Sequence, residues 1–375
     1  MPSATHEILK GKKILYIHRD GQGWGGAQQG VIDLIENFKK EFGATVFVGN
    51  KGLLLQRSRQ ANVTCYELPF HRVMLFPISF LLLAAVLIKE KPDLVHSNHR
   101  FTSILVQFAR KLIRGKFQTL HTARSVFHDK MFVRDVGDRV VAISESVKRN
   151  MVEQFAFPAE KIDVIYNGIE LSKNGASLPD NEKLAQIDVD SKIVFGIIGG
   201  LVESKGHTFL FQALSTLPER LKKQIVVLVA GEGYLAKELD LLVRRYQLSD
   251  SVVFLGHCRD IHRVLARCRF LVIPSIQEGG SRVLIEGYLT GIPSIAFGLL
   301  FAYEFIEHQK TGFIVPVRDV AALASAIQFY TEHPHIVSEH GHNGKLFATG
   351  KFTRQRMVDQ YRFIYEAMLD EPPPR

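Results

Sequence analysis

Two glutamates flank a glycine turn in the second half of the chain, where an apolar strand leads into a helix. Residues 270–273 (Phe-Leu-Val-Ile) are typical of a buried strand, and a Gly-Gly-Ser turn at 279–281 precedes the predicted helix. The first N–H groups of such a helix lie at the positive end of its dipole and can bind an anion. Glu286 would lie roughly 9 Å along the helix, within reach of a ribose whose phosphates are bound at its start. With Glu278 in the preceding loop, this pattern predicts a nucleotide site, although an ordinary βα turn would share it.

A single lysine supplies the second part of the predicted site. Residues 193–198 read as a strand, a Gly-Gly turn follows, and Lys205 comes just before another predicted helix. A lysine at a helix N-terminus opposes the helix dipole, so an anion between the two is the simplest explanation. A solvated loop lysine is the alternative.

Residues of the first half offer further candidates. His121 ends a predicted strand at the carboxyl edge, where open parallel sheets bind ligands, but a core histidine would fit the same pattern. Gly21, Gly23 and Gly26 match the G-x-G-x-x-G pattern of dinucleotide-binding proteins. The second predicted strand ends at Asn50 without a carboxylate for a ribose, which argues against nicotinamide or flavin binding.

Metal ligation is not indicated. His96 and His99 form a lone pair three residues apart, which is more often structural than metal-binding. Asp188 and Asp190 form an Asp-x-Asp pattern within a predicted linker. We therefore expect no metal requirement.

Charge is distributed unevenly along the 375 residues. The net charge is +9, and residues 1–185 carry 26 Lys and Arg against 18 Asp and Glu, whereas the remainder carries 21 against 20. A surplus of positive charge in one half suggests an acidic partner, either a phospholipid surface or a phosphorylated acceptor. No nucleic-acid-binding signature accompanies it. The three cysteines have no metal-like spacing, which favours a reducing compartment, and the polar start of the chain is no signal peptide, so we expect a cytoplasmic protein.

Apolar runs alternate with helical patterns along the whole chain, which predicts an α/β protein with two successive parallel sheets. The expected strands are 14–18, 45–48, 94–97, 117–121, 140–143, 162–165, 194–198, 226–230, 252–255, 270–273, 294–297 and 313–315. Residues 172–190 are polar and lack periodicity, so they read as a linker between domains 1–171 and 191–350.

Two helical segments of the first domain bear on membrane binding. Residues 73–88 carry no charge, but they are shorter than a membrane span and contain Pro77, so we expect a buried crossover helix. Residues 100–116 form an amphipathic pattern with a basic end. An ordinary surface helix and peripheral attachment to an anionic membrane both fit that pattern.

These motifs together resemble the retaining glycosyltransferases of the large fourth family, which have the two-domain GT-B fold. The resemblance covers nearly the whole chain. The matching segments are the glycine pair Gly25 and Gly26, Asp93-Leu-Val-His96, Thr119-Leu-His-Thr122, residues 138–147, residues 161–168, the pair Glu278 and Glu286, and residues 311–316.

The resemblance implies a GT-B fold, with two Rossmann-like domains whose parallel sheets face across a cleft. Residues 1–171 would bind the acceptor, residues 191–350 would bind a nucleotide sugar, and residues 351–375 would cross back onto the first domain. The implied reaction is metal-free transfer of a hexose, with retention, from a nucleotide diphosphate sugar, UDP-sugar being favoured. The implied acceptor is a hydroxyl of a cell-surface glycan or lipid-linked precursor, as in lipopolysaccharide biosynthesis. The enzyme would then be cytoplasmic or peripheral on the inner face of the membrane.

The resemblance also assigns residue roles. Glu286 would bind the ribose, and Glu278 would bind the sugar hydroxyls. The phosphates would be bound by the backbone of Arg282 and Val283 together with Lys205. The turn that contains Gly200 and the helix start at Ser281 would line the donor, as would Gly25 and Gly26 near the phosphates. His121 would contact the donor sugar, and the acceptor would enter near His121 and Arg124.

One departure from the family pattern weakens the predicted cationic site. Where the family usually has an arginine beside the leaving diphosphate, this chain has Gly200. We hypothesise that the Arg282 guanidinium replaces it. Two alternatives remain open from the sequence: a catalytically impaired member that serves as a partner subunit, and a nucleotide-sugar 2-epimerase of the same fold.

Overall fold

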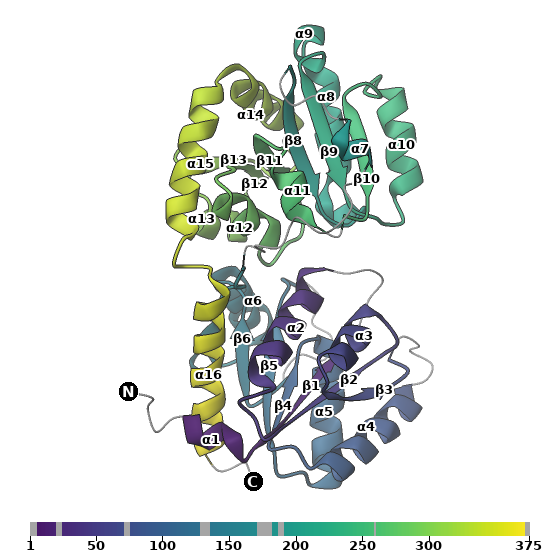
Figure 1. Ribbon diagram of the computed structural model, residues 1–375, viewed down its shortest axis with the longest axis vertical. Helices are drawn as coiled ribbons and strands as arrows, with labels where there is room; N and C mark the ends of the chain where they lie inside the picture. The colour runs from purple at the N-terminus through teal and green to yellow at the C-terminus, as the bar shows by residue number, and fades with distance from the viewer. Residues whose placement is uncertain are drawn as a thin grey trace. The chain divides into compact units, whose positions relative to one another are not determined.

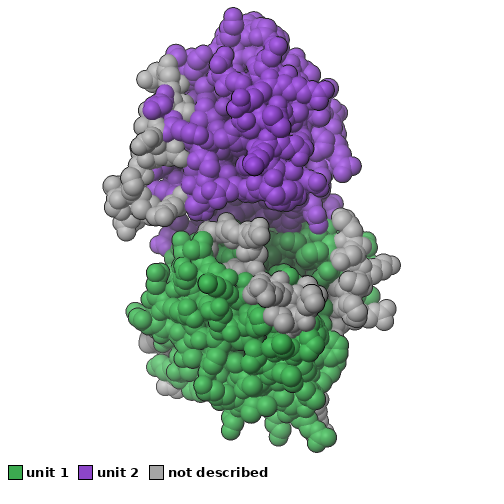
Figure 2. Space-filling view, turned by 90° about the vertical axis from the view of Figure 1, so that its right-hand side faces the viewer, with its two compact units in different colours: residues 1–168, 354–375 green, residues 169–353 purple. Residues whose placement is uncertain are grey.

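The computed structural model describes residues 6–19, 25–70, 76–127, 136–170, 182–186, 191–258 and 260–371. The chain forms two compact units (Figure 2). Unit 1 comprises residues 1–168 and 354–375, and unit 2 comprises residues 169–353. Each unit is built on its own parallel sheet, as the alternation of apolar runs and helical patterns predicts.

Unit 1 contains a parallel sheet of seven strands within the described residues, in the order β3-β2-β1-β4-β5-β6-β7. The strands are β1 (Lys13–His18), β2 (Ala44–Gly49), β3 (Thr64–Glu67), β4 (Leu94–Ser97), β5 (Gln118–Ala123), β6 (Arg139–Ala142) and β7 (Ile162–Val164). Sequence reasoning missed β3, because this edge strand is only half buried and lacks an apolar run.

Helices cover both faces of this sheet (Figure 1). The helices of unit 1 are α1 (His6–Lys10), α2 (Gly26–Phe38), α3 (Leu53–Gln60), α4 (Phe76–Glu90), α5 (Arg100–Ile113), α6 (Glu145–Phe155), the 3-10 turn η2 (Ala159–Lys161) and α16 (Arg354–Asp370). Helices α2, α3 and α16 pack on the face that carries Ile14 and Tyr16. Helices α4 and α5 pack on the opposite face, which carries Leu15 and Ile17.

Helix α16 belongs to unit 1, although it follows unit 2 in the sequence. Its buried face includes Tyr361 and Tyr365. The Tyr365 hydroxyl lies 2.7 Å from Nδ1 of His96, whose Nε2 lies 2.8 Å from the Thr122 hydroxyl. His96 is fully buried in this network. His96 therefore takes part in packing α16 onto the sheet.

Unit 2 contains a parallel sheet of six strands within the described residues, in the order β10-β9-β8-β11-β12-β13. The strands are β8 (Ile193–Ile198), β9 (Ile225–Ala230), β10 (Val252–Gly256), β11 (Phe270–Ile273), β12 (Ser294–Phe297) and β13 (Gly312–Val315). The helices are α7 (Glu182–Ala185), the 3-10 turn η3 (Glu203–Lys205), α8 (His207–Thr216), α9 (Glu219–Lys222), α10 (Ala236–Arg245), α11 (Ile261–Leu265), α12 (Arg282–Leu289), α13 (Leu300–Phe305), α14 (Val320–Glu332) and α15 (Pro334–Ala348). Strand β9 is buried along its whole length, as expected for a parallel sheet covered on both faces.

The structure bears differently on the predicted linker and on the predicted crossover helix. Most of residues 172–190, including Asp188 and Asp190, lies outside the described residues, but Leu184 within it is buried in the core of unit 2. Helix α4 buries only its inward face, so the expectation of a buried helix is wrong. Within the part of the chain that the structure describes, no helix is both long enough and apolar enough to cross a membrane.

Candidate functional site

In unit 2, the loop after β8 is held against the loop after β11. Gly206 ends η3 in the left-handed region, with φ of +70°, and a Cβ at this position would lie 1.9 Å from the carbonyl oxygen of Pro274. The N–H of Ile276 donates a hydrogen bond of 2.9 Å to the carbonyl of Ser204. Only glycine permits so close an approach with this backbone conformation. The contact brings the residues of η3 to the start of the β11–α12 loop.

Lys205 and Glu278 form an ion pair across these two loops. Both side chains are partly buried, and the Ser275 hydroxyl lies 3.5 Å from the same Glu278 oxygen that meets Lys205. The charge of Lys205 also affects the first residue of α8, His207. Burial and this charge together lower the pKa of His207 to about 4. The two residues that sequence reasoning placed on one ligand therefore lie together, with opposite charges in contact.

Helix α12 begins at the predicted glycine turn. Ser281 is its N-cap, and its hydroxyl accepts a hydrogen bond of 3.4 Å from the N–H of Leu284. The Arg282 Nε donates a hydrogen bond of 3.1 Å to the Glu286 carboxylate one turn along. Val283 is half buried beside them, next to the core of unit 2. The Arg282 guanidinium thus lies on the helix face that carries the predicted ribose-binding carboxylate.

Gly200 lies just after β8, where an added Cβ would make only ordinary van der Waals contacts. A Cβ at this position would meet nothing closer than 3.7 Å, where the carbonyl oxygen of Glu232 lies. Gly200 is exposed, and its N–H is not required by the ladder of β8, which ends at Ile198. A Cβ is therefore tolerated at this position without a steric clash.

Gly25 and Gly26 lie in unit 1 at the start of α2. Gly25 is the N-cap, with extended backbone, and its N–H donates a hydrogen bond of 3.1 Å to the side chain of Gln28. Both glycines are exposed. Gly21 and Gly23 of the dinucleotide-like pattern lie outside the described residues.

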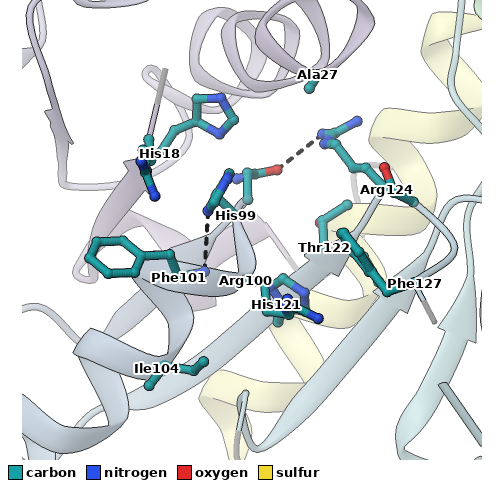
Figure 3. Close-up of a pocket in the computed structure, with 14 residues that line it drawn as sticks. His18, Ala27, His99, Arg100, Phe101, Ile104, His121, Thr122, Arg124 and Phe127 are labelled. Carbon is teal, nitrogen blue, oxygen red and sulfur yellow. Dashed lines mark hydrogen bonds between the residues drawn. The ribbon is translucent and has the colours of Figure 1, made fainter. Parts of the chain in front are cut away.

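A second candidate site is a pocket of about 550 Å³ in unit 1, at the carboxyl ends of β1, β4 and β5 (Figure 3). It contains the two residues predicted to meet the acceptor, His121 and Arg124. The Ser103 hydroxyl lies 2.7 Å from Nδ1 of His121, and Arg124 donates hydrogen bonds to the side-chain oxygens of Asn98 (3.0 Å) and Asn167 (3.2 Å). The pocket therefore positions both side chains through neutral partners.

Sequence reasoning missed several pocket residues. They are His18, Arg19, Asn98 and Phe127. Sequence reasoning placed Arg100, Phe101 and Ile104 only in an amphipathic helix, and it considered His99 only for metal binding. The Arg19 guanidinium lies 5.0 Å from the centre of the Phe101 ring, and that of Arg100 lies 4.5 Å from the centre of the Phe127 ring. The available signal was position, because His18 ends β1 and His99 follows β4 at the same carboxyl edge as His121.

The histidines of the pocket are neutral at pH 7. Burial lowers the pKa of His18 and of His121 to about 3, with further lowering by His99 and by the charge of Arg124. Burial and the charges of Arg19 and Arg100 lower the pKa of His99 to about 4. Neutral imidazoles can accept or donate single hydrogen bonds to hydroxyl groups. The pocket therefore combines hydroxyl-binding groups with guanidinium groups and aromatic rings.

Two family descriptions match the chain, one in each half. "Glycosyltransferase Family 4" matches residues 24–173, and "Glycosyl transferases group 1" matches residues 180–346. Among curated proteins, the chain is 24% identical over 313 residues to the UDP-Gal:alpha-D-GlcNAc-diphosphoundecaprenol alpha-1,3-galactosyltransferase of Escherichia coli, covering 78% of this chain and 79% of that protein. It is 25% identical over 334 residues to the capsular polysaccharide biosynthesis glycosyltransferase CapM of Staphylococcus aureus, covering 83% and 87%.

Solved structures share the fold across nearly the whole chain. The HepE protein of Anabaena, in complex with UDP-glucose, superimposes with a TM-score of 0.82 at 21% identity, covering 95% of this chain and all of that chain. The lipopolysaccharide outer core galactosyltransferase WaaB superimposes with a TM-score of 0.73 at 16% identity, covering 96% and 100%.

Proposed function

The chain is a glycosyltransferase of family 4, with the two Rossmann-like domains of the GT-B fold, and from this premise we propose that it transfers a hexose from a UDP-sugar to a lipid-linked glycan. We propose further that the anomeric configuration of the sugar is retained. The observation that carries the proposal is the meeting of Lys205, Glu278 and the start of α12 in unit 2. The donor would bind there, and the acceptor would bind in the pocket of unit 1.

Donor binding would reorganise the charges of unit 2. The diphosphate would accept hydrogen bonds from the backbone N–H groups of Arg282 and Val283, at the positive end of the α12 dipole. The Lys205 ammonium group would move from Glu278 toward the phosphates. The Glu278 carboxylate would then accept hydrogen bonds from the sugar hydroxyls. The Glu286 carboxylate, already fixed by Arg282, would bind the ribose.

The chemistry requires charge stabilisation more than an enzymic nucleophile. The glycosidic bond to the diphosphate breaks, and an acceptor hydroxyl forms the new bond on the same face of the sugar. The acceptor proton passes to a phosphate oxygen of the leaving diphosphate. Lys205 and the helix terminus would stabilise the negative charge that develops there, and such preorganised groups are usually the largest contribution to catalysis. We propose that these groups make a metal ion unnecessary.

The acceptor site is proposed for the pocket of unit 1. His121, His99 and His18 are neutral and buried there, so they can bind sugar hydroxyls without the cost of burying an imidazolium. Phe101 and Phe127 provide aromatic faces, and the guanidinium groups would attract an anionic group of the acceptor.

A lipid-linked acceptor is favoured by the relatives. The printed name of the E. coli relative specifies a diphosphoundecaprenol acceptor, and that of the S. aureus relative specifies capsular polysaccharide biosynthesis. For this chain we propose an acceptor of the same chemical class, a saccharide on a polyprenyl diphosphate, reached from the cytoplasmic side of a membrane.

The experiment that tests the proposed function is an acceptor-dependent assay of nucleotide release. Purified protein is incubated with UDP-, GDP- and ADP-hexoses, with and without a synthetic saccharide on a short polyprenyl diphosphate, in the presence of EDTA. We expect UDP release that depends on the acceptor, and a product whose new linkage has the donor's anomeric configuration by NMR. Absence of release with every donor, or a product of inverted configuration, would overturn the respective part of the proposal.

A further inference from the structure

Helix α4 carries an apolar stripe on the face that it turns away from the sheet. Its inward side chains, such as Leu83 and Leu87, pack in the core of unit 1. Its outward positions follow each other at three- and four-residue spacing, as one face of a helix does. These outward residues are Ile78 (50% exposed), Leu81 (62%), Leu82 (44%), Ala85 and Ile88 (58%). No charged side chain interrupts this stripe before Lys89.

The apolar stripe continues onto the neighbouring helix. Helices α4 and α5 pack against each other on the same face of the sheet, and Figure 1 shows them side by side. The rings of Phe76 and Phe101 meet edge to face at the helix starts, with centroids 6.0 Å apart. Phe108 and Leu112, one turn apart on α5, are 55% and 64% exposed. We refer to these exposed apolar residues as the α4–α5 face, which consists of Phe76, Ile78, Leu81, Leu82, Ile88, Phe108 and Leu112.

This face differs from that of an ordinary surface helix in the same chain. On α10 of unit 2, Leu241 is an isolated exposed apolar side chain among Lys237, Glu238 and Arg244. Single exposed apolar residues of this kind are normal in soluble proteins. A contiguous apolar face on two adjacent helices is unusual in a soluble protein, and such a face marks an interaction surface.

Basic residues border the α4–α5 face at the C-terminal ends of both helices. They are Lys89 in the last turn of α4, Lys91 just after it, and Lys111, Arg114 and Lys116 at the end of α5, and all five are exposed. The carboxylate between the first two, Glu90, accepts a hydrogen bond from Tyr66 and pairs with Lys13. An apolar stripe bordered by lysine and arginine matches the interface of an anionic bilayer, whose acyl chains lie beneath charged headgroups.

We propose that the α4–α5 face docks on an anionic phospholipid bilayer, with α4 lying in the plane of the membrane interface. The inference deepens the proposed function, since a lipid-linked acceptor resides in a bilayer, but docking itself requires no catalysis. A bilayer fits this face better than a second copy of the chain does. A second copy would present the same basic border and no complementary acidic surface on this face.

The test is co-sedimentation of the full chain with vesicles of phosphatidylcholine, with and without phosphatidylglycerol. We expect binding to the anionic vesicles that weakens as salt is added. The double variant Leu81→Gln, Ile88→Gln should lose at least about tenfold in vesicle affinity, because it removes two apolar side chains from the contact. Lys111→Gln, Arg114→Gln, Lys116→Gln should lose on the order of 100-fold on anionic vesicles, since each basic residue near such a surface contributes several-fold.

A matched control replaces exposed leucines of unit 2. Leu241→Gln, Leu346→Gln changes two side chains that are 66% and 64% exposed, and it should bind vesicles as the wild type does. UDP affinity, measured by calorimetry for every variant, shows whether the protein remains folded.

Three outcomes would overturn the docking proposal. The first is that anionic vesicles fail to sediment the wild type. The second is that the Leu81 and Ile88 variant binds them as tightly as the wild type does. The third is a dimer, seen by light scattering without vesicle binding, that this variant dissociates, which would assign the face to a second copy. Vesicle binding in a protein that transfers no sugar from any donor would contradict the proposed function and leave the docking surface in place.

Discussion

The two candidate sites handle charge in different ways. In unit 2, each cationic side chain of the predicted site touches a carboxylate, Lys205 with Glu278 and Arg282 with Glu286. In unit 1, guanidinium groups lie beside buried neutral histidines, and none of the described residues that line the pocket is a carboxylate. The charges of the unit 2 site are therefore balanced before a ligand binds. A bound diphosphate must replace a carboxylate as the partner of a cationic side chain. The unit 1 pocket instead keeps its imidazoles neutral at the cost of acid sensitivity.

The largest effect is expected from Lys205→Ala. A preorganised charge on a developing anion is typically worth about 3 kcal/mol, so turnover at saturating donor should fall by on the order of 10²-fold or more. The matched control is Lys237→Ala, an exposed lysine of α10 outside both sites. Wild-type turnover in Lys205→Ala would remove this lysine from the mechanism.

The second prediction tests whether the Arg282 guanidinium supplies the positive charge that Gly200 cannot. Arg282→Ala should lose at least about tenfold in turnover, since a hydrogen bond between charged groups contributes roughly 1.5–3 kcal/mol. Adding Gly200→Arg should restore part of the rate, because a Cβ at this exposed position makes no steric clash and the new guanidinium would supply a positive charge.

Two results would contradict this second prediction. If Arg282→Ala keeps its activity while Lys205→Ala is inactive, one lysine and the helix terminus suffice. If Gly200→Arg rescues nothing in an inactive Arg282→Ala, the arginine acts by fixing Glu286 and not by replacing the missing charge.

The third prediction separates the two glutamates. Glu286→Ala should weaken the affinity for UDP itself by about tenfold, because a ribose contact forms whether or not a sugar is attached. Glu278→Ala should chiefly weaken the intact UDP-sugar. Calorimetry with UDP and a UDP-hexose on both variants checks this, and an equal loss of UDP affinity in the two would mean that the roles are assigned wrongly.

The fourth prediction concerns the acid sensitivity of unit 1. The folded-state pKa of His121 is lowered to about 3, so the unfolded chain takes up protons first as the pH falls below about 6.5. Stability from this histidine is complete above that pH and is lost on acidification, by up to roughly 2 kcal/mol at pH 5. Urea unfolding at pH 7 and pH 5 should show a smaller difference for His121→Asn than for wild type. The exposed His342→Asn serves as the control, and a pH dependence unchanged in His121→Asn would refute the assignment.

How far the sequence could predict these features depends on how local they are. The strands of both sheets except β3 follow from apolar runs, and Lys205, Glu278 and Glu286 follow from glycine turns and spacing along a few residues. The contact of Gly206 with Pro274, which brings Lys205 to Glu278, is long-range and has no local signal. The pocket of unit 1 joins the ends of three strands, so only its strand-end residues could be anticipated.

Helix α4 shows why apolarity alone misleads. Residues 76–88 contain no charged side chain, which predicts burial, yet half of the helix circumference faces outward. A sequence pattern gives the number of apolar faces on a helix but not the number of faces that the fold covers. Here the sheet covers one face of α4, and the other gives rise to the docking proposal.

The most direct test of the central claim is hydrogen exchange of the full chain with and without saturating UDP, analysed by mass spectrometry. If unit 2 holds the donor, peptides that span residues 199–206 and 275–289 should exchange more slowly with UDP, because their N–H groups and side chains contact the diphosphate and ribose. Protection confined to peptides of the unit 1 pocket, such as 96–127, or no protection at UDP concentrations that saturate binding, would contradict the account.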